Sequence, residues 1–265
     1  MTIEKGVPIR AITRGLSVLQ AINRGGSITM MEIARTSQVP YPTACRIVQT
    51  LLHEGMIERE TSRKRYRATA LVQGLASGYH DESQLVAIAR PHIDALCDKL
   101  LWPISITSRV GAHMMVRDST HTRTSLTLNN YYPGFTLPIM ECSSGKVYMA
   151  YCSGEEREHL LEGLRTIEGA AEKLATLLLS NDTLLRDVRG KGYATQSRNA
   201  YTANPGKTSS IAVPLFRGDD VAGAIVVIFF AVAMPMEKAI DQFLGPLQAT
   251  AAAISAELGN VVIAA

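Results

Sequence analysis

The stretch TMMEIARTSQVPYPTACRIVQTLLHEGMIERETSRKRYRAT, residues 29–69, carries in order the signals of a capped helix, a turn, a second helix and a basic hairpin. Thr29 and Glu32 have the spacing of a capping box, in which a hydroxyl and a carboxylate satisfy free amides at a helix start. Residues 36–38 are expected to end this helix. Pro42 then falls in the first turn of the next one, where its missing N–H costs nothing. This order predicts a helix-turn-helix unit.

The expected second helix has one apolar side and one polar side. Its polar positions recur at helical spacing and are Thr43, Arg46, Thr50 and His53. A small helix of this kind can enter the major groove of DNA and present hydroxyl and guanidinium groups to base edges. We expect the groove contacts to come from Tyr41, Pro42, Thr43, Arg46 and Thr50.

A basic hairpin is expected after Gly55. Residues 56–59 and 63–67 predict two strands around a turn, and the second strand has four cations in five residues. Such a wing can rest on the DNA backbone or reach the minor groove. Phosphate contacts are expected from Arg63, Lys64 and Arg65, and from Arg14 in a preceding amphipathic helix whose apolar side includes Leu16. The alternative is a structural helical subdomain, but three helices followed by a basic hairpin favour a winged helix-turn-helix.

Charge is unevenly distributed along the 265 residues, whose net charge is only +3. Residues 1–80 contain 11 Lys/Arg and 5 Asp/Glu, a balance of +6, whereas residues 81–265 contain 16 and 19, a balance of −3. A basic head on a slightly acidic body suits a DNA-binding module joined to a control module. At 46% hydrophobic residues, the chain is long enough for two cores.

Several other classes of protein are not indicated. The N-terminus has no signal-type apolar run, and residues 221–230 are too short to span a bilayer and predict a buried strand, so we expect a cytoplasmic protein without a membrane partner. No nucleophile elbow, phosphate-binding loop or metal-spaced cluster is present, so we expect neither an enzyme nor a cofactor. The remaining alternative is a redox- or metal-responsive DNA-binding regulator that uses Cys142 and Cys152.

The chain resembles the IclR family of bacterial transcriptional regulators. Short motifs carry the resemblance in the right order across nearly the whole chain: residues 13–19, 32–34, Pro40, Thr43, Arg46, Leu51, Glu54 and Gly55, then Ser143, Gly145, Lys146, 192–193 and 211–214. The resemblance implies an α+β architecture with a winged helix-turn-helix (1–69), a linker helix (70–83) and a GAF-like α/β effector-binding domain (84–265). It also implies homodimers or tetramers on a palindromic operator in double-stranded DNA, with RNA polymerase as a further partner.

A candidate effector site lies at the expected helix start after Cys142. Small residues there expose free amides and the positive end of the helix dipole, which suits a carboxylate. The sequence alone leaves equally open an ordinary helix start with a serine cap. In the resembling family this loop commonly helps to hold a small organic acid, which implies roles for Ser143 and Ser144, with Ser210 donating from a neighbouring strand.

Two departures from the family pattern point to a less polar ligand. Residues 201–208 offer Lys207 where many members have an acid, and the last strand has Val226 and Ile228 where many have serines. The chain also resembles regulators of 3-(3-hydroxyphenyl)propionate and related aromatic-acid catabolism in residues 102–103, 116–121 and 210–215. We therefore expect an aromatic acid.

The aromatic-acid hypothesis assigns further residues to the site. The ring would be lined by Leu128, Met140, Val226 and Ile228, although plain core packing explains each of them as well. Arg109 or Arg117 would pair with the carboxylate, or else form a surface or interface salt bridge.

Overall fold

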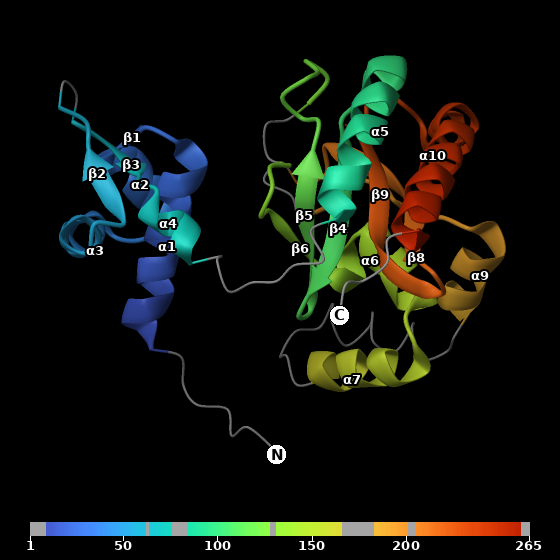
Figure 1. Ribbon diagram of the computed structural model, residues 1–265, viewed down its shortest axis with the longest axis horizontal. Coiled ribbons are helices and arrows are strands. Elements are labelled where there is room, and N and C mark those ends of the chain that lie inside the picture. The colour runs from blue at the N-terminus through green and yellow to red at the C-terminus, as the bar shows by residue number, and fades with distance from the viewer. Residues whose placement is uncertain are drawn as a thin grey trace. The chain divides into compact units, whose positions relative to one another are not determined.

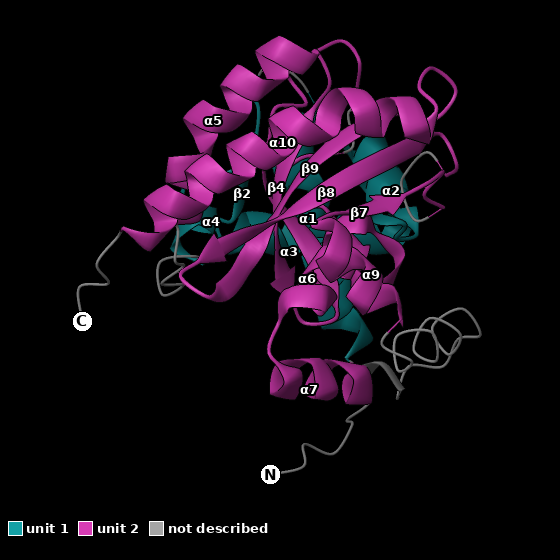
Figure 2. Ribbon diagram, turned by 90° about the vertical axis from the view of Figure 1, so that its right-hand side faces the viewer, with its two compact units in different colours: residues 1–81 teal, residues 82–265 magenta. Residues whose placement is uncertain are grey.

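The computed structural model describes residues 9–61, 64–75, 84–127, 131–165, 183–200 and 205–260. The chain divides into two compact units, Met1–Asp81 and Glu82–Ala265, shown in different colours in Figure 2. Within the described ranges, no helix is both long enough and apolar enough to cross a membrane.

The described part of the N-terminal unit combines three main helices, a short fourth helix and a small antiparallel sheet (Figure 1). Its helices are α1 (Arg10–Gly25), α2 (Met30–Ser37), α3 (Tyr41–His53) and the short α4 (Leu71–Gly74). The sheet has the order β1-β3-β2, with β1 (Ile28–Thr29), β2 (Ile57–Arg59) and β3 (Arg65–Ala68). The predicted winged helix-turn-helix is therefore present. Strand β1 was not expected, because two residues at a sheet edge leave no alternation to detect.

Local signals set the helix boundaries in this unit. The capping box forms as predicted: the Thr29 amide donates to Glu32 Oε2 at 2.7 Å, and the Glu32 amide donates to Thr29 Oγ1 at 3.3 Å. The Thr29 backbone bond is the main reason that the pKa of Glu32 is lowered. Helix α2 ends at Gln38, which adopts a left-handed conformation with φ 55°.

The core of the N-terminal unit lies between its three long helices and the wing. It is built from Val18, Leu19, Ile22, Ile33, Ala34, Val39, Ala44, Val48 and Ile57. The expectation that Leu16 belongs to the buried side of α1 is wrong, since its side chain is 54% exposed. The buried side of α1 is formed by Val18, Leu19, Ala21 and Ile22.

The C-terminal unit is built on a six-stranded antiparallel sheet with the order β6-β5-β4-β9-β8-β7. Its strands are β4 (Ile104–Val110), β5 (His113–Ser119), β6 (Thr136–Pro138), β7 (Ala194–Gln196), β8 (Thr208–Arg217) and β9 (Asp220–Phe230). Its helices are α5 (Gln84–Leu100), η1 (Ile139–Glu141), α6 (Ser143–Tyr151), α7 (Gly154–Arg165), α9 (Thr183–Lys191) and α10 (Met236–Gly259).

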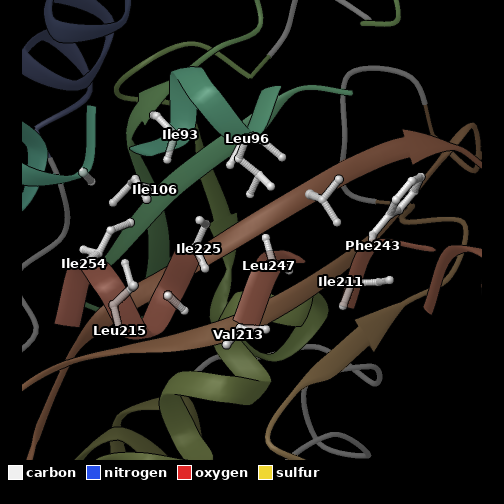
Figure 3. Packing of buried hydrophobic residues seen from close by; sticks show 14 of the residues in the cluster. Ile93, Leu96, Ile106, Ile211, Val213, Leu215, Ile225, Phe243, Leu247 and Ile254 are labelled. Atoms are coloured by element: carbon white, nitrogen blue, oxygen red, sulfur yellow. The ribbon is translucent and has the colours of Figure 1, made fainter. Parts of the chain in front are cut away.

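The sheet separates two buried layers. One face packs against α5 and α10, where Ile225 of β9 and Leu247 of α10 belong to one continuous apolar core (Figure 3). The other face packs against α6 and α9, and Val147 of α6 is fully buried there. Along β9 the residues alternate between the layers: 225, 227 and 229 join the first core and 224, 226 and 228 the second. Both faces of the central strands are therefore covered by helices.

Three segments of the chain have irregular local features. Helix α5 continues through Pro91, whose ring lies on the exposed side of the helix. Residues 125–127 form bends. The expected linker helix covers residues 70–83. Its described part is helical over Leu71–Gly74, and residues 76–83 lie outside the described residues.

Helix α6 begins at Ser143, so the small residues at 143–145 form its first turn instead of a preceding loop. Gly145 permits this arrangement, because a Cβ at that position would lie 1.7 Å from the carbonyl oxygen of Ile139. The backbone of η1 thus passes directly against the first turn of α6.

We predict that Gly145→Ala lowers the free energy of unfolding by about 1–3 kcal/mol or more, because a methyl group cannot be placed against the Ile139 carbonyl without moving backbone. Gly163→Ala is the control, since that glycine lies on exposed α7 with nothing within 4 Å of an added Cβ. Chemical denaturation of the full chain measures both. Equal stability of the two variants would show that η1 can move away at little cost.

Candidate DNA-binding surface and effector cavity

The polar side of α3 forms an exposed surface. Its first turn contains Tyr41 and Pro42, both exposed, and Arg46 and Thr50 follow on the same side of the helix. The opposite side of α3 contributes Ala44 and Val48 to the core. Burial of these small apolar residues therefore fixes which side chains face outward.

Helices α1 and α3 together line an open groove of about 620 Å³. Its walls are formed by Ala11, Arg14, Thr43, Arg46, Ile47, Gln49, Thr50 and His53. Four predicted DNA-contact residues, Arg14, Thr43, Arg46 and Thr50, are thus brought together from two helices. Within the described residues, neither Arg14 nor Arg46 forms an ion pair. Gln49 was not predicted to contact DNA, although its position about one helical turn after Arg46 indicated that it lies on the same side of α3.

The wing distributes its cations differently from the sequence expectation. Arg65 turns inward: its guanidinium donates to the Ser27 carbonyl at 2.6 Å and lies 3.8 Å from the Glu32 carboxylate. It therefore ties β3 to the start of α2 instead of facing outward. Lys64 is exposed at the beginning of the strand, and Arg63 lies outside the described residues.

A second hollow lies between the sheet and the start of α6, entirely within the C-terminal unit. It is a cavity of about 30 Å³. It is lined by Ser105, Thr107, Val116, Tyr131, Leu137, Cys142, Ser143, Ser144, Asn199, Thr208, Ser210, Val226 and Ile228. The predicted residues Ser143, Ser144, Ser210, Val226 and Ile228 are all among them. Strands from both halves of the sheet and the first turn of α6 therefore converge on one point.

Hydroxyl groups inside the cavity are arranged in pairs. Ser143 Oγ lies 2.8 Å from Ser210 Oγ, which joins α6 to β8, and the Tyr131 hydroxyl lies 2.8 Å from Thr208 Oγ1. Ser144 donates to Cys142 Sγ at 3.4 Å. A space of this size holds one or two water molecules, since one water needs about 10–15 Å³.

Among the described residues that line the cavity there is no lysine, arginine or histidine. Positive potential comes instead from the start of α6, where no side chain caps the helix and the dipole places roughly half a charge. Lys146 is in the first turn of the same helix, but its Nζ donates to the Thr195 carbonyl at 3.0 Å and to Gln196 Oε1 at 2.7 Å. Burial lowers the pKa of this lysine. An anion would therefore be held by hydroxyl and amide groups.

Three residues assigned to the effector from the sequence lie elsewhere. Arg109 pairs with Glu156 at 2.9 Å and packs over the Tyr148 ring, with 5.7 Å from its Cζ to the ring centroid. Arg117 donates to Ser108 Oγ at 3.0 Å. Met140 is core, and none of the three lines the cavity. Leu128 lies outside the described residues. Arg109 thus forms a salt bridge, which was the alternative expected for it, and it lies near the end of β4, beyond the cavity residue Thr107.

Several residues that line the cavity were not predicted from the sequence. Ser105 and Thr107 gave a signal, since they are polar residues that alternate with Ile104 and Ile106 in β4. Tyr131 and Asn199 gave none, because both reach the cavity from loops. Asn199 is anchored there by its own bonds: its side chain donates to the Glu141 carbonyl at 3.1 Å, and its amide donates to the Thr208 carbonyl at 2.9 Å.

The two cysteines of the redox alternative are buried free thiols. Burial raises the pKa of Cys142, and it raises the pKa of Cys152 to about 11. Reactive thiols have a lowered pKa, so these two are protonated and poor nucleophiles at neutral pH. Nothing in this geometry favours a redox sensor.

Comparisons with known proteins match both units. The profile of the IclR helix-turn-helix domain matches residues 11–61, and that of the C-terminal domain of the bacterial transcriptional regulator IclR matches residues 77–256. The DNA-binding transcriptional repressor YiaJ of Escherichia coli is 24% identical over 264 residues, which cover 98% of this chain and 91% of that protein. TsaQ1/TsaQ2, a regulator from Comamonas testosteroni, is 22% identical over 59% of this chain and 57% of that protein.

Two crystal structures show the same fold. The IclR of Thermotoga maritima has a TM-score of 0.64 and 19% identity, covering 95% of this chain and all (100%) of that one. An IclR homologue from Microbacterium hydrocarbonoxydans, solved with 4-hydroxybenzoate, has a TM-score of 0.64 and 20% identity. The match covers 94% of this chain and 98% of that one. The two profile matches confirm the expectation that the chain is a transcriptional regulator. With both domain profiles matched in order, the chain belongs to the IclR family of bacterial transcriptional regulators.

Proposed function

We propose that this regulator controls catabolic genes in response to a small aromatic acid that binds in the cavity between β8, β9 and the start of α6. The observation that carries the proposal is the cavity itself, where four hydroxyl groups and an uncapped helix start face Val226 and Ile228. A homologue solved with 4-hydroxybenzoate supports the same class of ligand.

For DNA binding, we propose that α3 enters the major groove of a palindromic operator. Tyr41, Pro42, Thr43, Arg46 and Thr50 would face base edges, and Arg14 with the wing residues Arg63 and Lys64 would face phosphates. Arg65 would act indirectly, since it holds β3 against the start of α2. Two copies of the chain would be needed to read the two half-sites, as a homodimer or tetramer, with RNA polymerase as the partner at the promoter.

Ligand binding would act on DNA through the packing of two copies. A ligand that contacts both α6 and the sheet binds most tightly to the arrangement of the two effector-binding units in which these elements are correctly placed around it. Binding therefore shifts the population toward that arrangement. The spacing of two α3 helices would change with that arrangement, and it must match half-sites about one DNA turn apart or a multiple of this. Coupling of this kind usually amounts to about 1–3 kcal/mol.

We predict that Arg46→Ala weakens binding to the operator by about 1–3 kcal/mol and relaxes specificity at one position, because a guanidinium that reads bases is lost. The operator is first selected from a pool of random duplexes, and affinities are then measured by fluorescence anisotropy. Lys64→Ala should instead weaken operator and random DNA alike and reduce the salt slope by about 1.

Arg24→Ala is the matched charge control, because Arg24 is exposed at the end of α1 and does not line the groove. If Arg46→Ala affected operator and random DNA equally, Arg46 would not read bases. If Arg24→Ala had the same effect as Arg46→Ala, overall charge would account for the loss.

For the effector, we predict that aromatic acids raise the melting temperature of the protein more than glyoxylate or pyruvate do. A ligand at 100 times its Kd stabilises by about 2.7 kcal/mol. Ser144→Asp should abolish this stabilisation, because the new carboxylate repels the acid group of the ligand. An aspartate is also compatible with the start of a helix. Arg109→Gln and Arg117→Gln should leave acid binding unchanged, since neither side chain lines the cavity. The effector proposal fails if no acid in the panel stabilises the wild-type protein.

A further inference from the structure

The effector cavity is far too small for the class of ligand proposed for it. Its volume is about 30 Å³, whereas an apolar cavity that admits benzene in another protein measures about 150 Å³. Its polar groups are nonetheless arranged as a binding site, with two hydroxyl pairs directed at one space. Some part of the protein must therefore occupy the volume that a ring would take.

Among the described residues that line the cavity, the one aromatic side chain is that of Tyr131. Only 5% of it is exposed, and its hydroxyl lies 2.8 Å from Thr208 Oγ1. The ring also makes an edge contact with Phe135, with centroids 5.7 Å apart and planes at 80°. A phenol group is thus already buried in this space, with its hydroxyl bonded to the cavity wall.

We infer that Tyr131 is an internal occupant of the effector cavity, and that a ligand carrying a phenol group displaces its side chain and takes over the bond to Thr208. This inference rests on the proposed effector function and specifies its ligand class. The exchange replaces a buried hydrogen bond by one of the same kind, so Thr208 is not left without a partner in the bound state.

The second hydroxyl pair indicates where the acid group of such a ligand binds. Thr208 and Ser210 are two residues apart on β8, so their side chains leave the same face of the sheet about 7 Å from each other. Thr208 belongs to the Tyr131 pair, and Ser210 to the Ser143 pair at the start of α6. The para substituents of a benzene ring have a similar separation. The cavity therefore fits a para-hydroxylated aromatic acid, with the carboxylate at the helix start.

The segment after Tyr131 can stay in place during the exchange. The Gly134 amide donates to the Val116 carbonyl at 2.7 Å, and the Val116 amide donates to the Phe135 carbonyl at 2.8 Å. These bonds fix the turn at 132–135 to β5. Displacement then requires a rotation of the Tyr131 side chain and not a rearrangement of the sheet.

The test uses the full chain and p-cresol, which is the tyrosine side chain as a free molecule. Tyr131→Ala should bind p-cresol about tenfold or more tightly than wild type, since the variant leaves a ring-sized space lined by the same groups. Tyr132→Ala is the matched control: it removes a neighbouring ring that also contacts Phe135 but does not line the cavity. Isothermal calorimetry measures the affinities, and a crystal structure locates the probe. Equal p-cresol binding by wild type and Tyr131→Ala would overturn the inference.

Tyr131→Phe provides an independent test if the alanine variant does not fold. It keeps the ring but removes the bond to Thr208, so the internal occupant is released more easily and 4-hydroxybenzoate should bind about 2- to 10-fold more tightly than to wild type. Benzoate, which lacks the hydroxyl, should bind every form more weakly than 4-hydroxybenzoate. Unchanged 4-hydroxybenzoate affinity in both Tyr131 variants would overturn displacement while leaving the effector proposal intact. Binding of p-cresol to Tyr131→Ala without binding of any acid to any form would overturn the effector proposal, and displacement with it.

Discussion

The C-terminal unit depends on the strict alternation of side chains along β8 and β9. In β9, residues 225, 227 and 229 pack toward α5 and α10, while 224, 226 and 228 face α6. In β8 the same alternation places Thr208 and Ser210 on the α6 side. A shift of one residue would bury the hydroxyls against α10 and turn the apolar residues toward the cavity. The large apolar layer on one face therefore fixes the register that creates a polar site on the other.

The described lining of the cavity combines hydrogen-bonding groups with an absence of charged side chains. Burying a carboxylate without compensation is costly, and here the compensation is restricted to hydroxyl groups and the start of α6. Lys146 is close in sequence but is tied to β7 by two bonds. A site of this kind selects by the positions of its donors and acceptors more than by charge. Such selection suits a ligand with two polar ends on a rigid ring.

The N-terminal unit uses its cations for two purposes. Arg46 and Arg14 face the open groove between α1 and α3, whereas Arg65 is directed at the Ser27 carbonyl and Glu32. The capping box makes this difference possible, because Glu32 both closes the start of α2 and supplies negative charge next to β3. The wing is thus attached to the helix-turn-helix through the same residue that starts α2.

The sequence by itself determined the features that depend on near neighbours: the capping box at Thr29, the outward side of α3, the buried strand over 221–230 and the helix start near Ser143. Periodicity and capping act over a few residues, so they can be read along the chain. Only the tertiary structure decided that Tyr131 and Asn199 reach the cavity, that Arg109 is paired with Glu156, and that Arg65 points inward. These outcomes depend on partners 33 to 77 positions away in sequence, from Glu32 for Arg65 to Thr208 for Tyr131. No local pattern encodes such a distance, because it is set by how the sheet and the helices pack.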